Sequence, residues 1–427
     1  MGLDLHVPGR NTALRAVSVV MVPTTLLPVR SGLVSAGSRI SFALWFPLTV
    51  YAVARLIDAV FIMIAARHQI DLPVGGNVYG SVTSNWDGQW YARIAAQGYP
   101  STIPRDVNGH AIQNEWGFYP VYPFLVGAIM RISGLGFTVV APILSTLLGA
   151  AAVTVMFRLV CQVAGRFAAS ATVILTCTYM AAPAMQIAYT DSLGLLLVCT
   201  ALLLLVNRRY GWLVPVLLAL ALTRAVALAL VPVLVVHGLS RYRRRAVEPF
   251  PVRDRWRLVS LAGLAVGVTG LWPTIAAVTT GDLKAYTETM SAWGKTGQLP
   301  VLIEFPAFAW AQGGVVGLLA LLSIIGFIAT IVLRSGARAW GPEVRAWAGF
   351  YPLYLLLATA PGSSNVRHLL LAFPLLWPFP DEATSAGDRR RRTAMVVVLA
   401  IFGLLTQWVW ISQFLVLTGP PKGRPYP

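Results

Sequence analysis

Long apolar runs, separated by short polar or basic segments, make up most of this 427-residue chain. A helix needs roughly 20 apolar residues to cross a bilayer, and the first run of that length covers residues 40–65. The apolar runs that follow, several of them short, cover residues 118–131, 137–158, 168–188, 191–206, 211–222, 225–237, 258–279, 313–333, 346–360, 369–379 and 394–417. The pattern predicts an all-α, polytopic membrane protein with about eleven transmembrane helices, some of them short.

The chain before residue 40 is expected to lie outside this helical domain. Its apolar run over 17–29 contains two prolines and is too short to span a bilayer. A cleaved signal peptide is the alternative, but no clear small-residue cleavage site follows the run. We therefore expect a cytoplasmic or interfacial tail over 1–39, one transmembrane domain over 40–418 and a C-terminal tail over 419–427.

Composition supports a membrane protein. Hydrophobic residues make up 57% of the chain and charged residues 11%, and the mean hydropathy is +0.69. A soluble domain of this length does not have that balance. The net charge of +17 gathers in short clusters between the apolar runs. Such clusters orient a membrane protein and do not indicate a nucleic-acid partner.

Cysteine and lysine usage add two smaller points. Cys161, Cys177 and Cys199 lie in or beside apolar runs, without the spacing of metal ligands. We therefore expect buried thiols and neither a metal site nor a disulfide framework. Only three of the 33 basic residues are lysines, and this arginine bias indicates a GC-rich bacterial genome. A bacterial plasma membrane is the expected location.

The basic clusters predict which side of the membrane each loop faces. Cytoplasmic loops are rich in arginine and lysine, and the clusters lie at 208–209, 241–257, 334–345 and 389–392. All four become cytoplasmic if residues 211–237 form a hairpin of two short helices and the segment 118–131 stays on the outer surface. The polar loops over 67–136 and 281–312 then face outward together.

Residues 84–100 form the most distinctive polar segment of the first outer loop. Asp87 lies there between Trp86 and Trp90, and apolar residues recur at helical spacing over 89–97. This pattern predicts a short amphipathic helix on the bilayer surface. Asp87 would either cap that helix or act as a general base toward a hydroxyl group. An acid among flat rings that stack on sugars indicates chemistry on a lipid-linked carbohydrate.

Charged residues also interrupt the apolar runs. Arg224 lies within such a region, where an unpaired charge is costly. It would form an ion pair with Asp191 or Asp58, or bind a phosphate through its bidentate guanidinium group. Arg367 and His368 precede the run at residue 369 and allow the same phosphate role, or a simpler one as side chains that reach the interface.

Two further acids have alternative roles. Asp191 opens the run over 191–206, where it would cap a helix, bind an acceptor hydroxyl or orient an arginine. Glu115 is either a solvated loop acid or a partner of Asp87, because two acids near one pocket can divide proton abstraction and hydroxyl binding between them.

A set of short motifs, in chain order, resembles the GPI mannosyltransferase II (PIG-V) family. The motifs are Trp86-Asp87-Gly88, Trp90-Tyr91, Ile94-Ala95, Gly98-Tyr99, Glu115 before Phe118-Tyr119-Pro120-Val121-Tyr122-Pro123, Tyr189-Thr190-Asp191-Ser192, Leu222-Thr223-Arg224 and Arg367-His368. The resemblance extends over residues 84–378. The sequence departs from the family pattern at Tyr119, where the family has Phe, at Asp191, where it has Glu, and at Gly117, where Ala is common.

The resemblance implies membership of the GT-C superfamily of membrane glycosyltransferases. It implies a polyprenyl-phosphate sugar donor, usually of mannose, an inverting reaction, Asp87 as the general base, and no required metal or other cofactor. The donor phosphate is expected at Arg224, Arg367 and His368. The residues expected to contact the acceptor or the sugar are Trp86, Trp90, Tyr91, Tyr99, Glu115, Tyr119, Tyr189 and Asp191. The acceptor would be a lipid-linked glycan, a glycolipid or a protein.

Two other classes of protein stay open. A transporter or lipid flippase would suit the intramembrane charges and the break near Arg224, although the chain has no internal repeat and its first loop is long and aromatic. A non-catalytic scaffold would not need Arg224 and Asp191 within the apolar zone. The sequence leaves the sugar, the acceptor, the linkage, metal dependence and the oligomeric state open.

Overall fold

The fold is described from a computed structural model over residues 36–70, 76–294, 301–379 and 385–419. The chain divides into two units, residues 1–41 and 42–427. The described part of the first unit is only the start of α1, so the predicted tail over 1–39 lies almost wholly outside the described residues. All described elements except the first residues of α1 belong to the second unit.

The described residues are mostly helical and form no strand; a single bridge joins Arg105 and Ala111. The α-helices are α1 (Ala36–Ala65), α2 (Val78–Thr83), α3 (Asp87–Gln97), α4 (Val121–Ser133), α5 (Phe137–Ala164), α6 (Arg166–Cys177), α7 (Asp191–Val206), α8 (Tyr210–Ala221), α9 (Leu230–Arg243), α10 (Val252–Gly267), α11 (Leu271–Thr280), α12 (Ala285–Ala292), α13 (Val301–Leu333), α14 (Gly341–Ala358), α15 (Ser364–His368) and α16 (Ala386–Trp410). Short 3₁₀ segments include η2 (Glu115–Gly117), η3 (Ala182–Met185) and η7 (Leu369–Leu375), and the π-helical turn η8 (Ile411–Leu415) continues α16.

Five helical stretches of the described chain are long and apolar enough to cross a membrane. They are Phe42–His68, Phe137–Ala164, Val252–Thr280, Ile303–Leu333 and Ala386–Leu415. This chain is therefore an integral membrane protein. The expected number of about eleven spans is not confirmed, because other apolar helices, such as α6, α7 and α8, are shorter than 18 residues.

Two predicted spans are not continuous α-helices. The run over 168–188 is helical only as α6 and then continues as a buried, largely irregular segment that contains η3. The run over 369–379 begins as η7, which contains Pro374. Proline lacks a backbone N–H donor and interrupts helices. Apolar side chains are removed from water equally well inside the protein and in lipid, so an apolar run need not be a transmembrane helix. The two short helices expected within 211–237 are present as α8 and α9.

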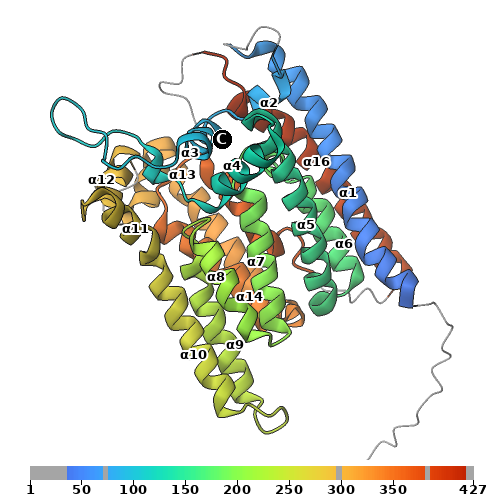
Figure 1. Cartoon of the computed structure of the whole chain (residues 1–427). Helices are drawn as coiled ribbons and strands as arrows, with labels where there is room; N and C mark the ends of the chain where they lie inside the picture. The colour runs from blue at the N-terminus through green and yellow to red at the C-terminus, as the bar shows by residue number, and fades with distance from the viewer. Residues whose placement is uncertain (1–35, 71–75, 295–300, 380–384, 420–427) are drawn as a thin grey trace, which may run out of the picture. The chain divides into compact units, whose positions relative to one another are not determined.

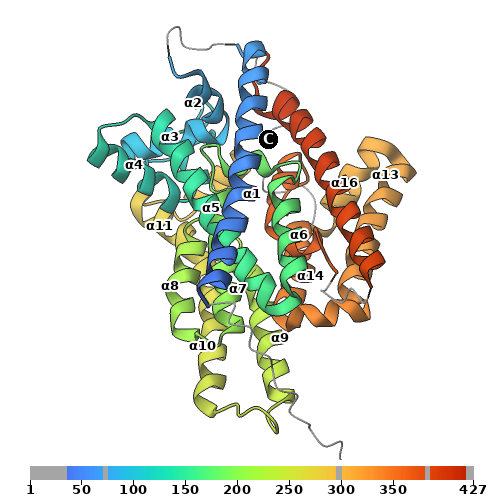
Figure 2. The ribbon, with the colours of Figure 1, turned by 90° about the vertical axis from the view of Figure 1, so that its right-hand side faces the viewer.

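The interior is built around α5, which packs against α6 and α7, while α14 packs against α9. α6 also lies beside α16 (Figure 2). Close packing needs a glycine on α5: a Cβ on Gly149 would lie 2.1 Å from the hydroxyl oxygen of Tyr51. That hydroxyl donates to the carbonyl of Met185 at 3.0 Å, so α1 and α5 together support the irregular segment that leads to α7.

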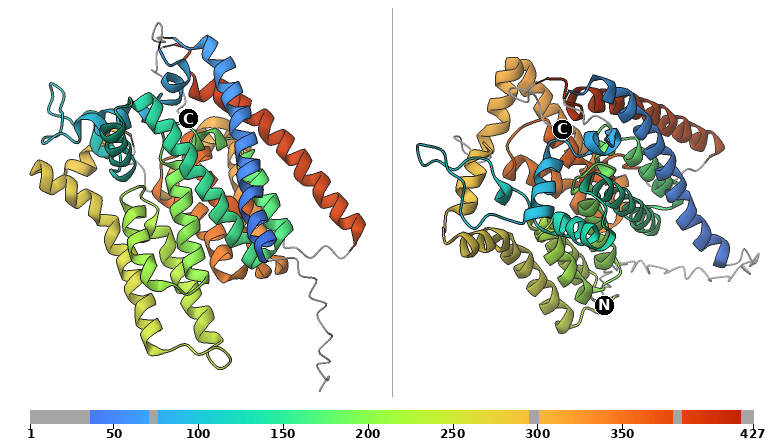
Figure 3. Two further views of the ribbon diagram at one scale, coloured as in Figure 1. Left: turned by 45° about the vertical axis from the view of Figure 1, so that its right-hand side comes forward. Right: turned by 45° about the horizontal axis from the view of Figure 1, so that its top comes forward.

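The predicted outer-loop elements gather at one end of the helices. α2, α3, α4 and α12 lie at this end, opposite the connection between α9 and α10 (Figure 1). This end comes forward in the right-hand view of Figure 3. α3 packs on α4, and α12 packs on η2. The amphipathic helix expected over 89–97 is present, and it begins two residues earlier, at Asp87.

Candidate functional site

Four charged side chains form a continuous chain of ion pairs. Arg367 Nη2 lies 2.9 Å from Asp87 Oδ2, and Arg367 Nη1 lies 3.5 Å from Asp191 Oδ2. The other oxygen of Asp191, Oδ1, lies 2.9 Å from Arg224 Nη1. The order is therefore Asp87, Arg367, Asp191, Arg224, with acids and bases alternating. The two positive charges and two negative charges balance within the cluster.

Four separate segments supply these groups. Asp87 and Asp191 lie in the first turns of α3 and α7. Arg367 lies in α15, and Arg224 follows α8. A carboxylate in the first turn of a helix interacts favourably with the helix dipole, which helps to retain both acids at these positions.

The interpretation of either acid as a helix cap is wrong. Trp86 occupies the N-cap position of α3 and Thr190 that of α7, and neither cap side chain makes a capping hydrogen bond. Asp87 and Asp191 each lie one residue inside their helix, and their carboxylates point to arginines instead. Of the two partners considered for Arg224, the structure selects Asp191; Asp58 pairs with Arg55 on α1, at 2.9 Å.

Exposure separates the roles of the two acids. The Asp191 side chain is fully buried, whereas that of Asp87 keeps 31% of its surface exposed. Arg367 is buried, and its guanidinium group also lies 4.4 Å from the centre of the Tyr189 ring. Arg224 retains 11% exposure. The cluster thus has a buried middle, Arg367 and Asp191, and two ends that are more open, Asp87 and Arg224.

Tyr91 borders this cluster from α3. Its ring is buried against Phe118 and Tyr122, with ring centres 5.3 Å apart in both pairs. Burial raises the pKa of the Tyr91 phenol, and the negative charge of Asp87 raises it further. The phenol is therefore a neutral hydrogen-bonding group beside the acid and does not compete with it as a base.

Several aromatic residues with a predicted sugar-binding role pack against other protein groups. Trp90 stacks on Phe118, with ring centres 5.8 Å apart, and Arg93 lies 4.6 Å from its ring centre. The Tyr99 hydroxyl donates to the Phe118 carbonyl at 3.0 Å, and burial raises its pKa. The hydroxyls of Tyr119 and Tyr286 lie 3.1 Å apart.

The remaining predicted residues lie on the edges of the same region. The Trp86 indole donates to the carbonyl of Leu415 at 3.1 Å. Glu115 Oε1 lies 4.0 Å from Arg93 Nη1 on α3. The backbone carbonyl of His368 accepts a hydrogen bond from Tyr351 at 2.8 Å, which fixes the end of α15 where Arg367 lies.

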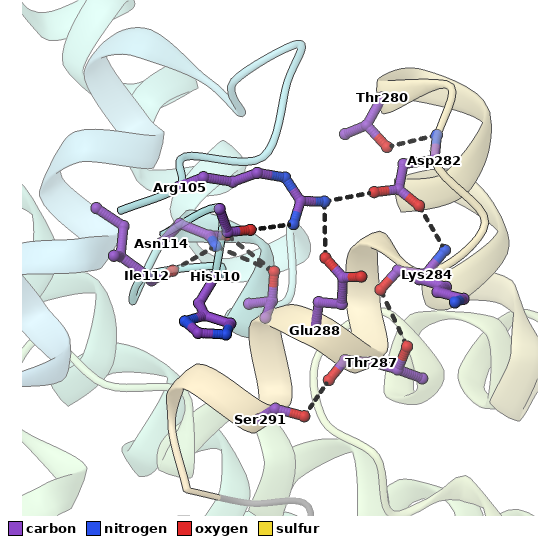
Figure 4. Close-up of polar contacts among 12 residues, drawn as sticks. Arg105, His110, Ile112, Asn114, Thr280, Asp282, Lys284, Thr287, Glu288 and Ser291 are labelled. Atoms are coloured by element: carbon purple, nitrogen blue, oxygen red, sulfur yellow. Dashed lines mark hydrogen bonds and ion pairs between the residues drawn. The ribbon is translucent and has the colours of Figure 1, made fainter. Parts of the chain in front are cut away.

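A second charged group, not anticipated from the sequence, joins the two predicted outer loops (Figure 4). Arg105 Nη2 lies 3.0 Å from Asp282 Oδ2 and 2.7 Å from Glu288 Oε2. Asn114 Nδ2 donates to Thr289 Oγ1 at 3.0 Å. The sequence could have indicated this contact, because the two loops are expected on the same face of the membrane and carry opposite charges. The contacts hold α12 over the first loop, where Trp293 meets Trp90 edge to face.

Among the described residues, no three His, Cys, Asp or Glu side chains form a group that could hold a metal ion. The cluster contains only two carboxylates, and both face arginines. Metal independence stays a prediction. The arrangement that is present offers one accessible carboxylate, Asp87, that could accept a proton, and one more open guanidinium group, Arg224, that could bind an anion.

No protein-family model and no curated protein sequence matches this chain. Solved structures are similar to it in fold. The archaeal oligosaccharyltransferase AglB from Archaeoglobus fulgidus, in complex with an inhibitory peptide and a dolichol-phosphate, gives a TM-score of 0.50 at 12% identity, over 89% of this chain and 57% of AglB. ArnT from Cupriavidus metallidurans, bound to undecaprenyl phosphate, gives a TM-score of 0.51 at 15% identity, over 88% of this chain and 70% of ArnT.

This chain therefore spans little more than half the length of AglB. At these identities the likeness concerns the fold alone. The predicted all-α membrane fold is confirmed, and it is similar to the folds of AglB and ArnT.

Proposed function

We propose that this protein is a membrane glycosyltransferase that moves a sugar from a polyprenyl-phosphate donor to an acceptor hydroxyl. The observation that carries the proposal is the ion-pair chain that ends in a partly exposed carboxylate, Asp87, at one end and in Arg224 at the other. Its fold is shared with two proteins whose structures hold dolichol-phosphate and undecaprenyl phosphate.

The proposal assigns the donor phosphate first to Arg224. Arg367 already directs both terminal nitrogens to acids and one face to Tyr189, so its main role is to hold the two acids in place. Arg224 contacts Asp191 through Nη1, and a guanidinium group has five N–H donors. Arg224 is thus suited to bind phosphate oxygens while it keeps its ion pair. Arg367 and His368 complete the phosphate site.

The reaction needs one proton acceptor and one stabilised leaving group. Asp87 takes the proton of the acceptor hydroxyl as that oxygen attacks the anomeric carbon of the sugar. The bond between the anomeric carbon and the phosphate oxygen breaks, and its electron pair stays with the polyprenyl phosphate. The arginines stabilise the additional negative charge on the phosphate. Attack opposite to the leaving group inverts the anomeric centre.

The finer assignment rests on the PIG-V resemblance and on the charge pattern of the loops. The resemblance favours mannose as the sugar. The basic clusters favour an active site on the outer face of a bacterial plasma membrane, where a cell-envelope glycolipid, a lipid-linked glycan or a secreted protein would be the acceptor. Trp90, Tyr91, Tyr99, Glu115, Tyr119, Tyr189 and Asp191 stay proposed contacts of the acceptor or the sugar. The indole of Trp86 donates to the Leu415 carbonyl instead.

The proposal is tested with purified protein in lipid nanodiscs. Radiolabelled polyprenyl-phosphate mannose is incubated with the protein and a membrane-lipid extract, and the label is followed from the donor to a new product. Transfer by the wild type, and its loss in Asp87→Asn, supports the proposal. Movement of the labelled lipid across the bilayer without a new product would instead indicate a flippase.

A further inference from the structure

The turn that precedes Asp87 has a strained backbone. Trp86 has a φ angle of +57°, and among the described residues only Arg208 is another non-glycine residue with positive φ. A bulky residue in this conformation costs free energy and persists only where surrounding contacts impose it. Trp86 is the N-cap residue of α3, and Asp87 is the first residue of that helix.

The end of the C-terminal helix supplies those contacts. The π-helical turn η8 ends at Leu415. The Leu415 carbonyl accepts two hydrogen bonds from the turn that precedes Asp87. One comes from Asn85 Nδ2 and the other from Trp86 Nε1, both at 3.1 Å. Leu415 is the last residue of this helical segment, and the last carbonyls of a helix have no acceptor role within it, so this carbonyl is available to residues remote in sequence.

Gln69 strengthens the same connection. Its side-chain amide and that of Asn85 bond reciprocally, at 2.9 and 3.1 Å. Gln69 Oε1 also accepts from the backbone N–H of Leu417 at 3.1 Å, and the N–H of Ile70 donates to the Leu417 carbonyl at 2.8 Å. Three parts of the chain, around residues 69, 85 and 415–417, are therefore joined by hydrogen bonds next to the site.

The opposite side of the turn is connected to the ion-pair chain. The Tyr189 hydroxyl donates to the Asn85 carbonyl at 3.4 Å, and the Tyr189 ring lies beside the guanidinium group of Arg367. Arg367 in turn contacts Asp87. The backbone before Asp87 and the partner of its carboxylate are thus fixed within one connected set of contacts.

We infer that Asn85 and Trp86 are positioning residues that the Leu415 carbonyl holds in place, and that they direct the carboxylate of Asp87 toward the acceptor. This inference rests on the proposed function. A carboxylate that is 31% exposed has room to move, so its alignment depends on the backbone that carries it. Small displacements of a reacting group lower the rate of turnover much more than they lower binding.

The test compares two tryptophan variants that lose the same kind of hydrogen bond. Trp86→Phe removes the indole donor to Leu415. Trp272→Phe is the control, since the Trp272 indole donates to the Trp116 carbonyl, also at 3.1 Å, and not to the turn. We expect Trp86→Phe to lower kcat about tenfold with both KM values within about twofold, and Trp272→Phe to leave kcat within about twofold. A wild-type kcat in Trp86→Phe, or equal losses in both variants, would overturn the inference.

A second measurement does not depend on sugar transfer. Hydrogen–deuterium exchange of the peptide covering residues 84–97 is expected to be faster in Trp86→Phe and in Asn85→Leu than in the wild type, and unchanged in Trp272→Phe. Unchanged exchange in both turn variants would overturn the inference even if the protein is a transferase. Faster exchange in a protein without transferase activity would instead refute the proposed function and leave the structural connection standing. If Trp86→Phe fails to fold, the exchange rate of residues 84–97 in Asn85→Leu tests the inference in its place.

Discussion

Arg367 Nη2 lies 2.9 Å from Asp87 Oδ2, although 280 positions separate the two residues in the sequence. The contact joins the first residue of α3 to the short helix α15, which precedes η7. It pairs Oδ2 of Asp87 with a cation; under the proposed function, Oδ1 is the oxygen that accepts the proton of the acceptor hydroxyl.

Asp87→Asn is expected to lower kcat by about 10² to 10⁴-fold, because an amide cannot take the acceptor proton. The amide oxygen can still accept the hydrogen bond from Arg367, so the protein should fold and insert into the membrane normally. Transfer of labelled sugar gives the rate, and the thermal unfolding midpoint gives the control. A rate close to that of the wild type would remove Asp87 from the role of base.

Arg224→Gln is expected to raise the KM for the donor much more than the KM for the acceptor, because the neutral side chain cannot pair with a phosphate. Arg224→Lys keeps the charge but loses the bidentate geometry, so it should lie between the wild type and Arg224→Gln. Steady-state kinetics with each substrate varied separately make the comparison. The phosphate role is incorrect if only the acceptor KM changes.

Asp191→Asn is expected to destabilise the protein by about 3–5 kcal/mol, because the substitution leaves buried guanidinium groups without their shared carboxylate. Asp388→Asn is the matched control. Asp388 pairs with Arg392 at 3.1 Å but is 38% exposed, and an exposed pair contributes only about 0–1 kcal/mol. Reversible denaturation in detergent micelles measures both. Equal losses of unfolding free energy in the two variants would show that burial does not determine how much the Asp191 ion pairs stabilise the protein.

Gly149→Ala is expected to destabilise the packing of α1 against α5 by about 1–3 kcal/mol, since the new methyl group would overlap the Tyr51 hydroxyl. Tyr51→Phe in the same chain should recover part of this loss because it removes the overlapping oxygen. Gly263→Ala on α10 serves as the control, as no atom lies within 4 Å of the added carbon. Thermal unfolding of the four proteins tests the prediction; a stable Gly149→Ala variant without the second change would contradict it.

The sequence by itself determined the class of protein and singled out the residues of the ion-pair chain. Its apolar runs identify a helical membrane protein, and the run over 191–206 coincides with α7. The segment around Asp87 and the charges at Arg224, Asp191 and Arg367 stood out because polar groups are costly next to apolar runs. These are local properties, which composition and spacing record directly.

Tertiary structure alone decided which groups are partners and which apolar runs are helices. Arg224 had two candidate acids in the sequence, and only packing selected Asp191. The run over 168–188 became a helix and then a buried irregular segment, held by contacts such as the hydrogen bond from Tyr51 to Met185. An apolar residue is equally satisfied by lipid and by protein, and an ion pair joins residues without regard to their separation along the chain. Hydrophobic periodicity therefore cannot encode either outcome.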